Sequence, residues 1–89
     1  MILGMMSNKN HVEYINYFKH KISSLTTVDI PNQPNAINGE DLMKKFKNLK
    51  NIYYKKSIKE AISSIDLKDN DIIIITGSLY LAGEVLNLN

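Results

Sequence analysis

The sequence contains no cysteine. This absence excludes a disulfide framework, a thiolate metal site and a thiol nucleophile. The two histidines, His11 and His20, stand nine positions apart, and no third ligand accompanies them at a spacing typical of metal sites. We therefore expect both histidines to be surface or partly buried helical residues rather than zinc ligands.

Long hydrophobic runs are also absent. No segment reaches the roughly 20 apolar residues that a membrane span needs. The apolar opening, residues 1–6, lacks a basic leader and is too short for a signal peptide. Eleven basic residues are nearly balanced by nine acidic ones, for a net charge of +2, so the charge does not require nucleic acid. We expect a cytoplasmic protein with neither a membrane nor a nucleic acid as its partner.

Three sequence motifs that are typical of enzymes are missing from the 89 residues. There is no G-x-x-x-x-G-K-[ST] phosphate loop and no G-x-G-x-x-G dinucleotide fingerprint. There is also no G-x-S-x-G nucleophile elbow. No catalytic constellation is visible in the sequence.

The most informative stretch is residues 71–85, in which four consecutive isoleucines, Ile72 to Ile75, end in Thr76-Gly77-Ser78. A strand with one face in water alternates apolar and polar residues, and this run does not. The pattern predicts an interior strand of a parallel sheet, buried on both faces. The Gly77-Ser78 corner would then lie at the carboxyl edge of the sheet, where open α/β folds bind ligands.

Strands and helices alternate along the rest of the chain. Residues that can cap a helix, with acidic residues in the following turn, stand at Asn10, Asn38 and Ser57. We expect strands near residues 1–6, 25–30, 52–54 and 71–76, and helices near residues 11–23, 39–49, 58–65 and 79–86. The order β-α-β-α-β-α-β-α implies parallel pairing through crossover helices. We predict one α/β domain, a small three-layer Rossmann-like unit with about four mostly parallel strands and four helices.

The first strand starts almost at the first residue, and two interpretations remain open. The chain can begin in the middle of a larger fold, or this can be an ordinary N-terminal strand docked into the sheet.

Three loops at the predicted carboxyl edge carry the candidate site. Gly77 and Ser78 offer backbone amides and a hydroxyl that could hold a carboxylate or phosphate, although they could equally form a turn and a helix cap. Lys9 follows the first strand and could reach the same ligand, or could simply be solvated. The loop at residues 34–36 follows the second strand and would border the same edge.

Three segments resemble one known family. They are, in this order, Ile2-Leu3-Gly4-Met5-Met6-Ser7-Asn8-Lys9-Asn10, then Pro34-Asn35-Ala36 ahead of Gly39-Glu40-Asp41-Leu42, and then Thr76-Gly77-Ser78-Leu79-Tyr80-Leu81-Ala82-Gly83-Glu84-Val85. They look like the C-terminal end of the folylpolyglutamate synthase/dihydrofolate synthase family, which are Mur-type ATP-dependent amide ligases. The opening segment matches a G-x-x-x-D-K-D pattern in which Asn8 and Asn10 replace the acids.

The resemblance implies a Rossmann-like C-terminal domain that closes over a larger ATP-binding domain. In that family, ATP and magnesium make an acyl phosphate on folate or dihydropteroate, which the amine of L-glutamate then attacks. The family's phosphate loop and its D-G-A-H-N-P motif are absent here. The resemblance therefore implies part of a C-terminal domain, truncated at its N-terminus, which holds no cofactor alone.

From the resemblance, Ser78, Gly77 and Lys9 are the candidate substrate-binding residues, and no catalytic or metal-binding residue is assigned. We expect the chain to be inactive alone, with a separately encoded N-terminal ligase fragment as its possible partner. The alternative is a non-catalytic α/β module that docks on such a fragment or binds a small anion at the Gly77-Ser78 corner.

Overall fold

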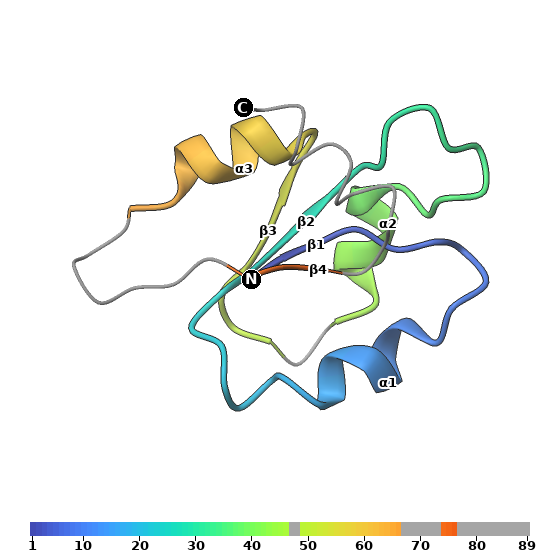
Figure 1. The fold of residues 1–89 in the computed structure, drawn as a ribbon. Coiled ribbons are helices and arrows are strands. Elements are labelled where there is room, and N and C mark those ends of the chain that lie inside the picture. The colour runs from blue at the N-terminus through green and yellow to red at the C-terminus, as the bar shows by residue number, and fades with distance from the viewer. Residues whose placement is uncertain (47–48, 67–73, 77–89) are drawn as a thin grey trace.

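The computed structural model describes residues 1–46, 49–66 and 74–76 (Figure 1). The described elements are β1 (Ile2–Leu3), α1 (His11–Asn16), β2 (Leu25–Val28), α2 (Gly39–Lys44), β3 (Ile52–Lys55), α3 (Ile58–Ser64) and β4 (Ile75–Thr76). The four strands form one parallel sheet in the order β3-β2-β1-β4. The predicted α/β class and parallel pairing are confirmed. The fourth predicted helix, near residues 79–86, lies outside the described residues.

Among the described strands, β1 and β2 are the interior strands of the sheet, and the isoleucine strand is not. Ile2 pairs with Thr26 of β2 on one side and with Ile75 of β4 on the other. Within the described residues, β4 lies at the end of the sheet, and Ile74 beside it is 47% exposed. The prediction of an interior isoleucine strand buried on both faces is therefore wrong for its described part. The uninterrupted apolar pattern indicated a strand correctly, but it did not encode which neighbour pairs with it.

Helices cover the sheet on both faces. On one face, α1 and α2 pack against a cluster that comprises Met1, Leu3, Met5, Ile15, Leu25, Leu42 and Phe46. On the other face, α3 packs against a cluster that comprises Ile2, Val28, Ile30, Ile58 and Ala61. The chain runs from β1 through β2 to β3 in one direction and then returns past β1 to β4. Crossovers of constant handedness therefore place α3 opposite α1 and α2, as Figure 1 shows for α3 and α1.

The starts of the three described helices were predicted correctly because their signals are local. The side chain of Asn10 accepts a hydrogen bond from the backbone of Glu13, Asn38 does the same for Asp41, and Ser57 for Glu60. These caps satisfy backbone donors that have no partner within the helix. The buried faces of α2 and α3 also follow the predicted spacing, since Leu42 and Ile58 lie in the core.

The end of α1 was predicted wrongly. The helix ends at Asn16 rather than near Ser23, and the chain continues in tight turns. The backbone amide of Phe18 donates to the carbonyl of Ile15 at 2.9 Å, three residues back, which is the spacing of a tightened turn. Aromatic and β-branched residues crowd this segment and favour an α-helix only weakly. None of the described helices is long and apolar enough to cross a membrane.

Candidate functional site

The strand order predicts a ligand crevice at the carboxyl ends of β1 and β4. The chain leaves β1 toward β2 on one side, whereas β4 on the other side is reached from β3. The order of connections thus reverses between β1 and β4. In open α/β sheets, loops that diverge at such a point leave a crevice in which ligands bind. The topology therefore selects the loops after β1 and β4 as the candidate site.

Thr76, the last described residue of β4, lies at this edge of the sheet. Its carbonyl accepts a hydrogen bond from the backbone amide of Gly4 at 3.3 Å, which joins the ends of β4 and β1. Its hydroxyl lies 2.5 Å from the hydroxyl of Tyr14, which reaches it from α1. Thr76 is thus fixed by a strand on one side and a helix on the other. Gly77 and Ser78, the predicted substrate-binding residues, lie outside the described residues.

The loops after β1 and β2 meet at the same edge. Met6 and Ala36 form an isolated antiparallel bridge. The amide of Ser7 donates to the carbonyl of Asn35 at 2.8 Å, and the amide of Ile37 donates to the carbonyl of Met5 at 3.1 Å. The prediction that the loop at residues 34–36 borders this edge is confirmed. These bonds fix the backbone from which Lys9 extends.

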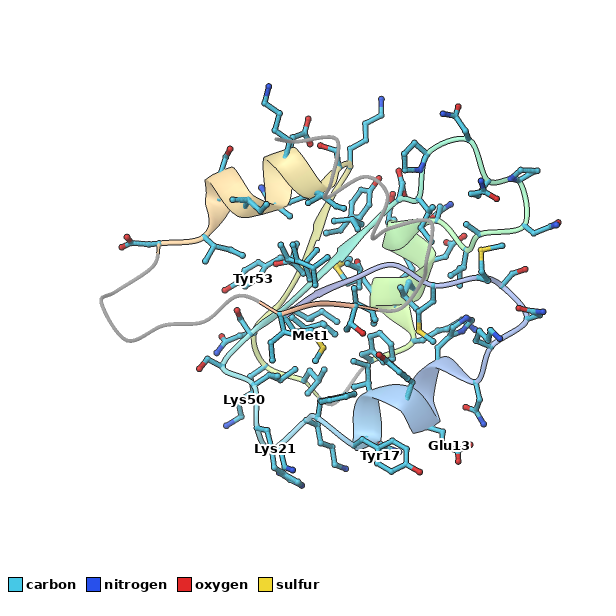
Figure 2. The ribbon with its side chains drawn as sticks, viewed as in Figure 1. Met1, Glu13, Tyr17, Lys21, Lys50 and Tyr53 are labelled. Carbon is cyan, nitrogen blue, oxygen red and sulfur yellow. The ribbon has the colours of Figure 1, made fainter. Side chains whose placement is uncertain are left out.

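Lys9 lies at a shallow hollow of about 320 Å³ beside α1. Its side chain is exposed, and Asn10, Glu13, Tyr14 and Tyr17 line the hollow with it. Tyr14 connects this hollow to the crevice, because the same ring that lines it carries the hydroxyl that contacts Thr76. Figure 2 shows Glu13 and Tyr17 projecting from α1 away from the sheet. The structure thus brings Lys9 to the predicted edge, with a carboxylate as its neighbour.

The two histidines have different surroundings. His11, in the first turn of α1, is buried, and its Nε2 lies 2.9 Å from the carbonyl oxygen of Met6. Because a carbonyl only accepts hydrogen bonds, Nε2 must carry the proton. This bond ties α1 to the loop after β1. His20 is exposed, lies beyond the end of α1 and lines a different cavity.

Asp29 holds the loops of the candidate site together, and the sequence analysis did not single it out. It follows β2 at the carboxyl edge, and its Oδ1 accepts a hydrogen bond from the amide of Gly39 at 2.6 Å. Its Oδ2 accepts one from the hydroxyl of Tyr54 at 2.8 Å. The carboxylate therefore joins β2, the start of α2 and the end of β3. The available signal was its position, since a carboxylate directly after a buried strand of a parallel sheet lies at the edge that carries ligands.

Asp29 also changes the acidity of Tyr54. The hydrogen bond from Tyr54 to the carboxylate, together with burial and the negative charge of Asp29, raises the pKa of Tyr54 to about 12. Ionising the phenol would break the bond and place two negative charges side by side. Because both oxygens of Asp29 are already occupied, the arrangement is suited to holding the loop in place.

Comparison with known proteins yields no relative: no protein family, curated protein or solved structure matches the chain.

Proposed function

We propose that this chain supplies the C-terminal part of a ligase of the folylpolyglutamate synthase/dihydrofolate synthase type. Such an enzyme adds L-glutamate to folate or dihydropteroate through an acyl phosphate. The observation that carries the proposal is the convergence of the three segments that resemble this family. Ser7 is bonded to Asn35, and Gly4 is bonded to Thr76, which directly precedes Gly77 and Ser78 in the sequence. Segments as far apart in the sequence as Gly4 and Thr76 thus meet at one edge of the sheet.

Within this proposal, Lys9 has the role of an anion contact. Its ammonium is exposed at the rim of the crevice, where a substrate carboxylate or phosphate could pair with it. Gly77 and Ser78 would contribute backbone amides and a hydroxyl from the loop after β4. The same proposal assigns the chain to the cytoplasm. ATP and magnesium would be held by another part of the enzyme, because the 89 residues contain no phosphate-loop sequence.

The proposal is tested by an ATP- and glutamate-dependent ligation assay. The 89-residue chain alone should give no product, whereas co-expression with the N-terminal fragment of a ligase of this type should give a complex that forms folylglutamate. In that complex, Lys9→Gln should lower the rate, and Lys59→Gln, which removes the same charge from α3, should not. Failure to form an active complex, or turnover by the chain alone, would contradict the proposal.

The alternative is a free-standing module that binds a small anion at this edge. Lys9 favours it, but Glu13 lines the same hollow and opposes an anion there. A phosphate titration followed by NMR distinguishes the two functions. Saturable shifts at Lys9 without any partner would support the anion-binding module and count against the requirement for a second ligase fragment.

A further inference from the structure

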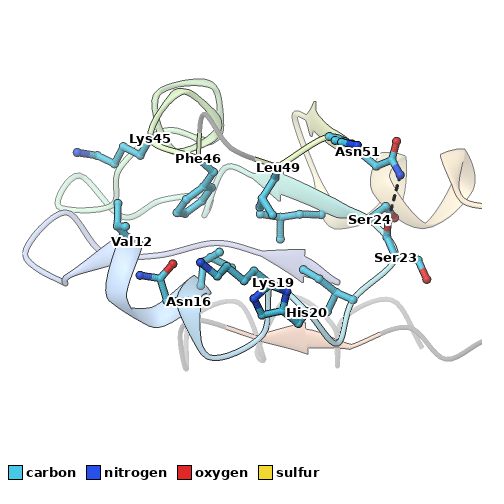
Figure 3. Close-up of a pocket in the computed structure, with 14 residues that line it drawn as sticks. Val12, Asn16, Lys19, His20, Ser23, Ser24, Lys45, Phe46, Leu49 and Asn51 are labelled. Atoms are coloured by element: carbon cyan, nitrogen blue, oxygen red, sulfur yellow. Dashed lines mark hydrogen bonds between the residues drawn. The ribbon is translucent and has the colours of Figure 1, made fainter.

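A second cavity, of about 480 Å³, lies at the opposite end of the strands from the crevice (Figure 3). Ser24, which directly precedes β2, and Asn51, which directly precedes β3, both line it. It therefore opens at the amino ends of these strands, between the segments that follow α1 and α2. This location makes it independent of the ligase proposal, which concerns the carboxyl edge.

The cavity exists because both helices end early. The apolar spacing predicted that α1 would continue to Ser23 and that α2 would carry Leu49 inward, but the helices end at Asn16 and Lys44. Ile22 and Leu49 therefore line the cavity from non-helical segments and are only partly buried.

The floor of the cavity is apolar. Ile15, Leu25 and Phe46 line it, and all three belong to the hydrophobic core on this face of the sheet. Val12, which lines the same cavity, is 48% exposed. A volume within the usual range of ligand pockets and a hydrophobic lining are the features of a small-molecule site.

The rim of the cavity carries charge of one sign. Lys19, Lys45 and Lys50 line it and are exposed, and His20 stands beside Lys19 in the chain. Among the described residues that line the cavity, none is acidic. Lysine side chains can lay their methylene groups on an apolar surface while the ammonium group stays in water. Figure 3 shows Lys19 and Lys45 at the border of the cavity, with the ammonium group of Lys45 directed outward.

We propose that this cavity binds a small amphiphilic anion, with its apolar body on the floor and its carboxylate among the rim lysines. The apolar floor of the cavity suits the apolar body of such a ligand, and the lysines at the rim suit its carboxylate. A simple inorganic anion would leave the apolar floor in water, and a purely apolar ligand would leave the lysines unused. The side-chain amide of Asn51, at the mouth of the cavity, already has a partner in the protein, because its Nδ2 donates to the carbonyl of Ser23 at 3.3 Å.

The first test compares two probes of equal chain length, decanoate and decanol, which differ in charge. NMR titration of the 89-residue chain, below the concentration at which decanoate forms micelles, should show saturable shifts at Val12, Ile22 and Leu49. Decanoate should bind about fivefold more tightly than decanol, and raised salt should reduce the difference. Equal affinities, or shifts that map elsewhere in the chain, would overturn the proposal.

The second test changes the cavity itself. The double variant Lys19→Gln/Lys50→Gln should weaken decanoate binding about three- to tenfold and leave decanol binding unchanged. The control, Lys56→Gln/Lys59→Gln, removes the same charge from residues that do not line the cavity. Leu49→Trp should fill the cavity and weaken both probes, with circular dichroism to verify folding. Equal weakening by the two double variants would reduce the effect to net charge and overturn the proposal.

Discussion

The hydroxyl of Tyr14 lies 2.5 Å from Oγ1 of Thr76, across 62 positions of the sequence. This bond connects the first helix of the chain to the end of β4, where the strand order reverses. The ring of Tyr14 also packs against Phe18 at a centroid distance of 5.5 Å, in a tilted arrangement. The position of Thr76 thus depends on the phenol group of Tyr14 as well as on the pairing of β4 with β1.

Tyr14→Phe should destabilise the fold by about 1 kcal/mol, since it removes this hydrogen bond and retains the ring. Urea unfolding followed by circular dichroism measures the change. Tyr17→Phe is the matched control, because Tyr17 is 71% exposed and should lose less than about 0.5 kcal/mol. In a double-mutant cycle, Thr76→Val should add little to Tyr14→Phe; full additivity would show that the two hydroxyls do not interact.

The bond between Tyr54 and Asp29 predicts a stability change at alkaline pH. The pKa of Tyr54 is raised to about 12 in the folded chain, against an ordinary value of 10.0. Its contribution to stability is therefore fully present below pH 10 and is lost as the pH rises toward 12. Tyr54→Phe should remove this dependence. The difference between the two chains, measured by urea unfolding at several pH values, isolates the phenol from the other tyrosines.

Asp29→Asn tests whether the carboxylate of Asp29 raises the pKa of Tyr54, because this variant removes the charge and nearly preserves the shape of the side chain. The pKa of Tyr54 should then fall toward 10, as seen in the ultraviolet absorbance of the ionised phenol. A tyrosine that still titrates near pH 12 in the variant would mean that burial, rather than Asp29, sets its acidity.

Gly39 is predicted to tolerate no side chain. A Cβ built at this position would lie 2.6 Å from Cε1 of Tyr54 and 2.8 Å from the carbonyl carbon of Val28. The ring could rotate away, but the backbone of β2 cannot. Gly39→Ala should therefore cost about 1–3 kcal/mol, although alanine favours helices. Ser63→Ala, at an exposed position of α3, is the control and should change the free energy of unfolding by less than about 0.5 kcal/mol.

Features of the fold that depend on near neighbours in the sequence could be predicted. The cap of each described helix rests on a pair of residues three positions apart, such as Asn38 and Asp41, so a sequence pattern contains both partners. The parallel sheet followed from the alternation of strands and helices. The end of α1 could not be predicted in this way, because the apolar spacing continues to Ile22 whereas Tyr17 and Phe18 favour an α-helix only weakly.

The candidate site was predictable only in part. The rule that ligands bind at carboxyl edges led to Lys9 and to the loop at residues 34–36, which the structure brings together. Asp29 was missed because its partners, Gly39 and Tyr54, lie 10 and 25 positions away. The cavity with the lysine rim could not be predicted either. It lies where α1 and α2 end earlier than their apolar spacing indicates.

The contrast between Ile2 and Ile74 provides the sharpest test of the sheet order. Ile2 is fully buried between β2 and β4, whereas Ile74 is 47% exposed, although the backbone amide of Ile2 donates to the carbonyl of Ile74 at 2.7 Å. The same substitution, isoleucine to valine, removes one methyl group and leaves that backbone bond in place. Ile2→Val should cost about 1 kcal/mol, and Ile74→Val less than about 0.5 kcal/mol, in urea unfolding. Equal losses would mean that Ile74 is as deeply buried as the unbroken apolar run predicts, which would contradict its place beside an outer strand of the sheet.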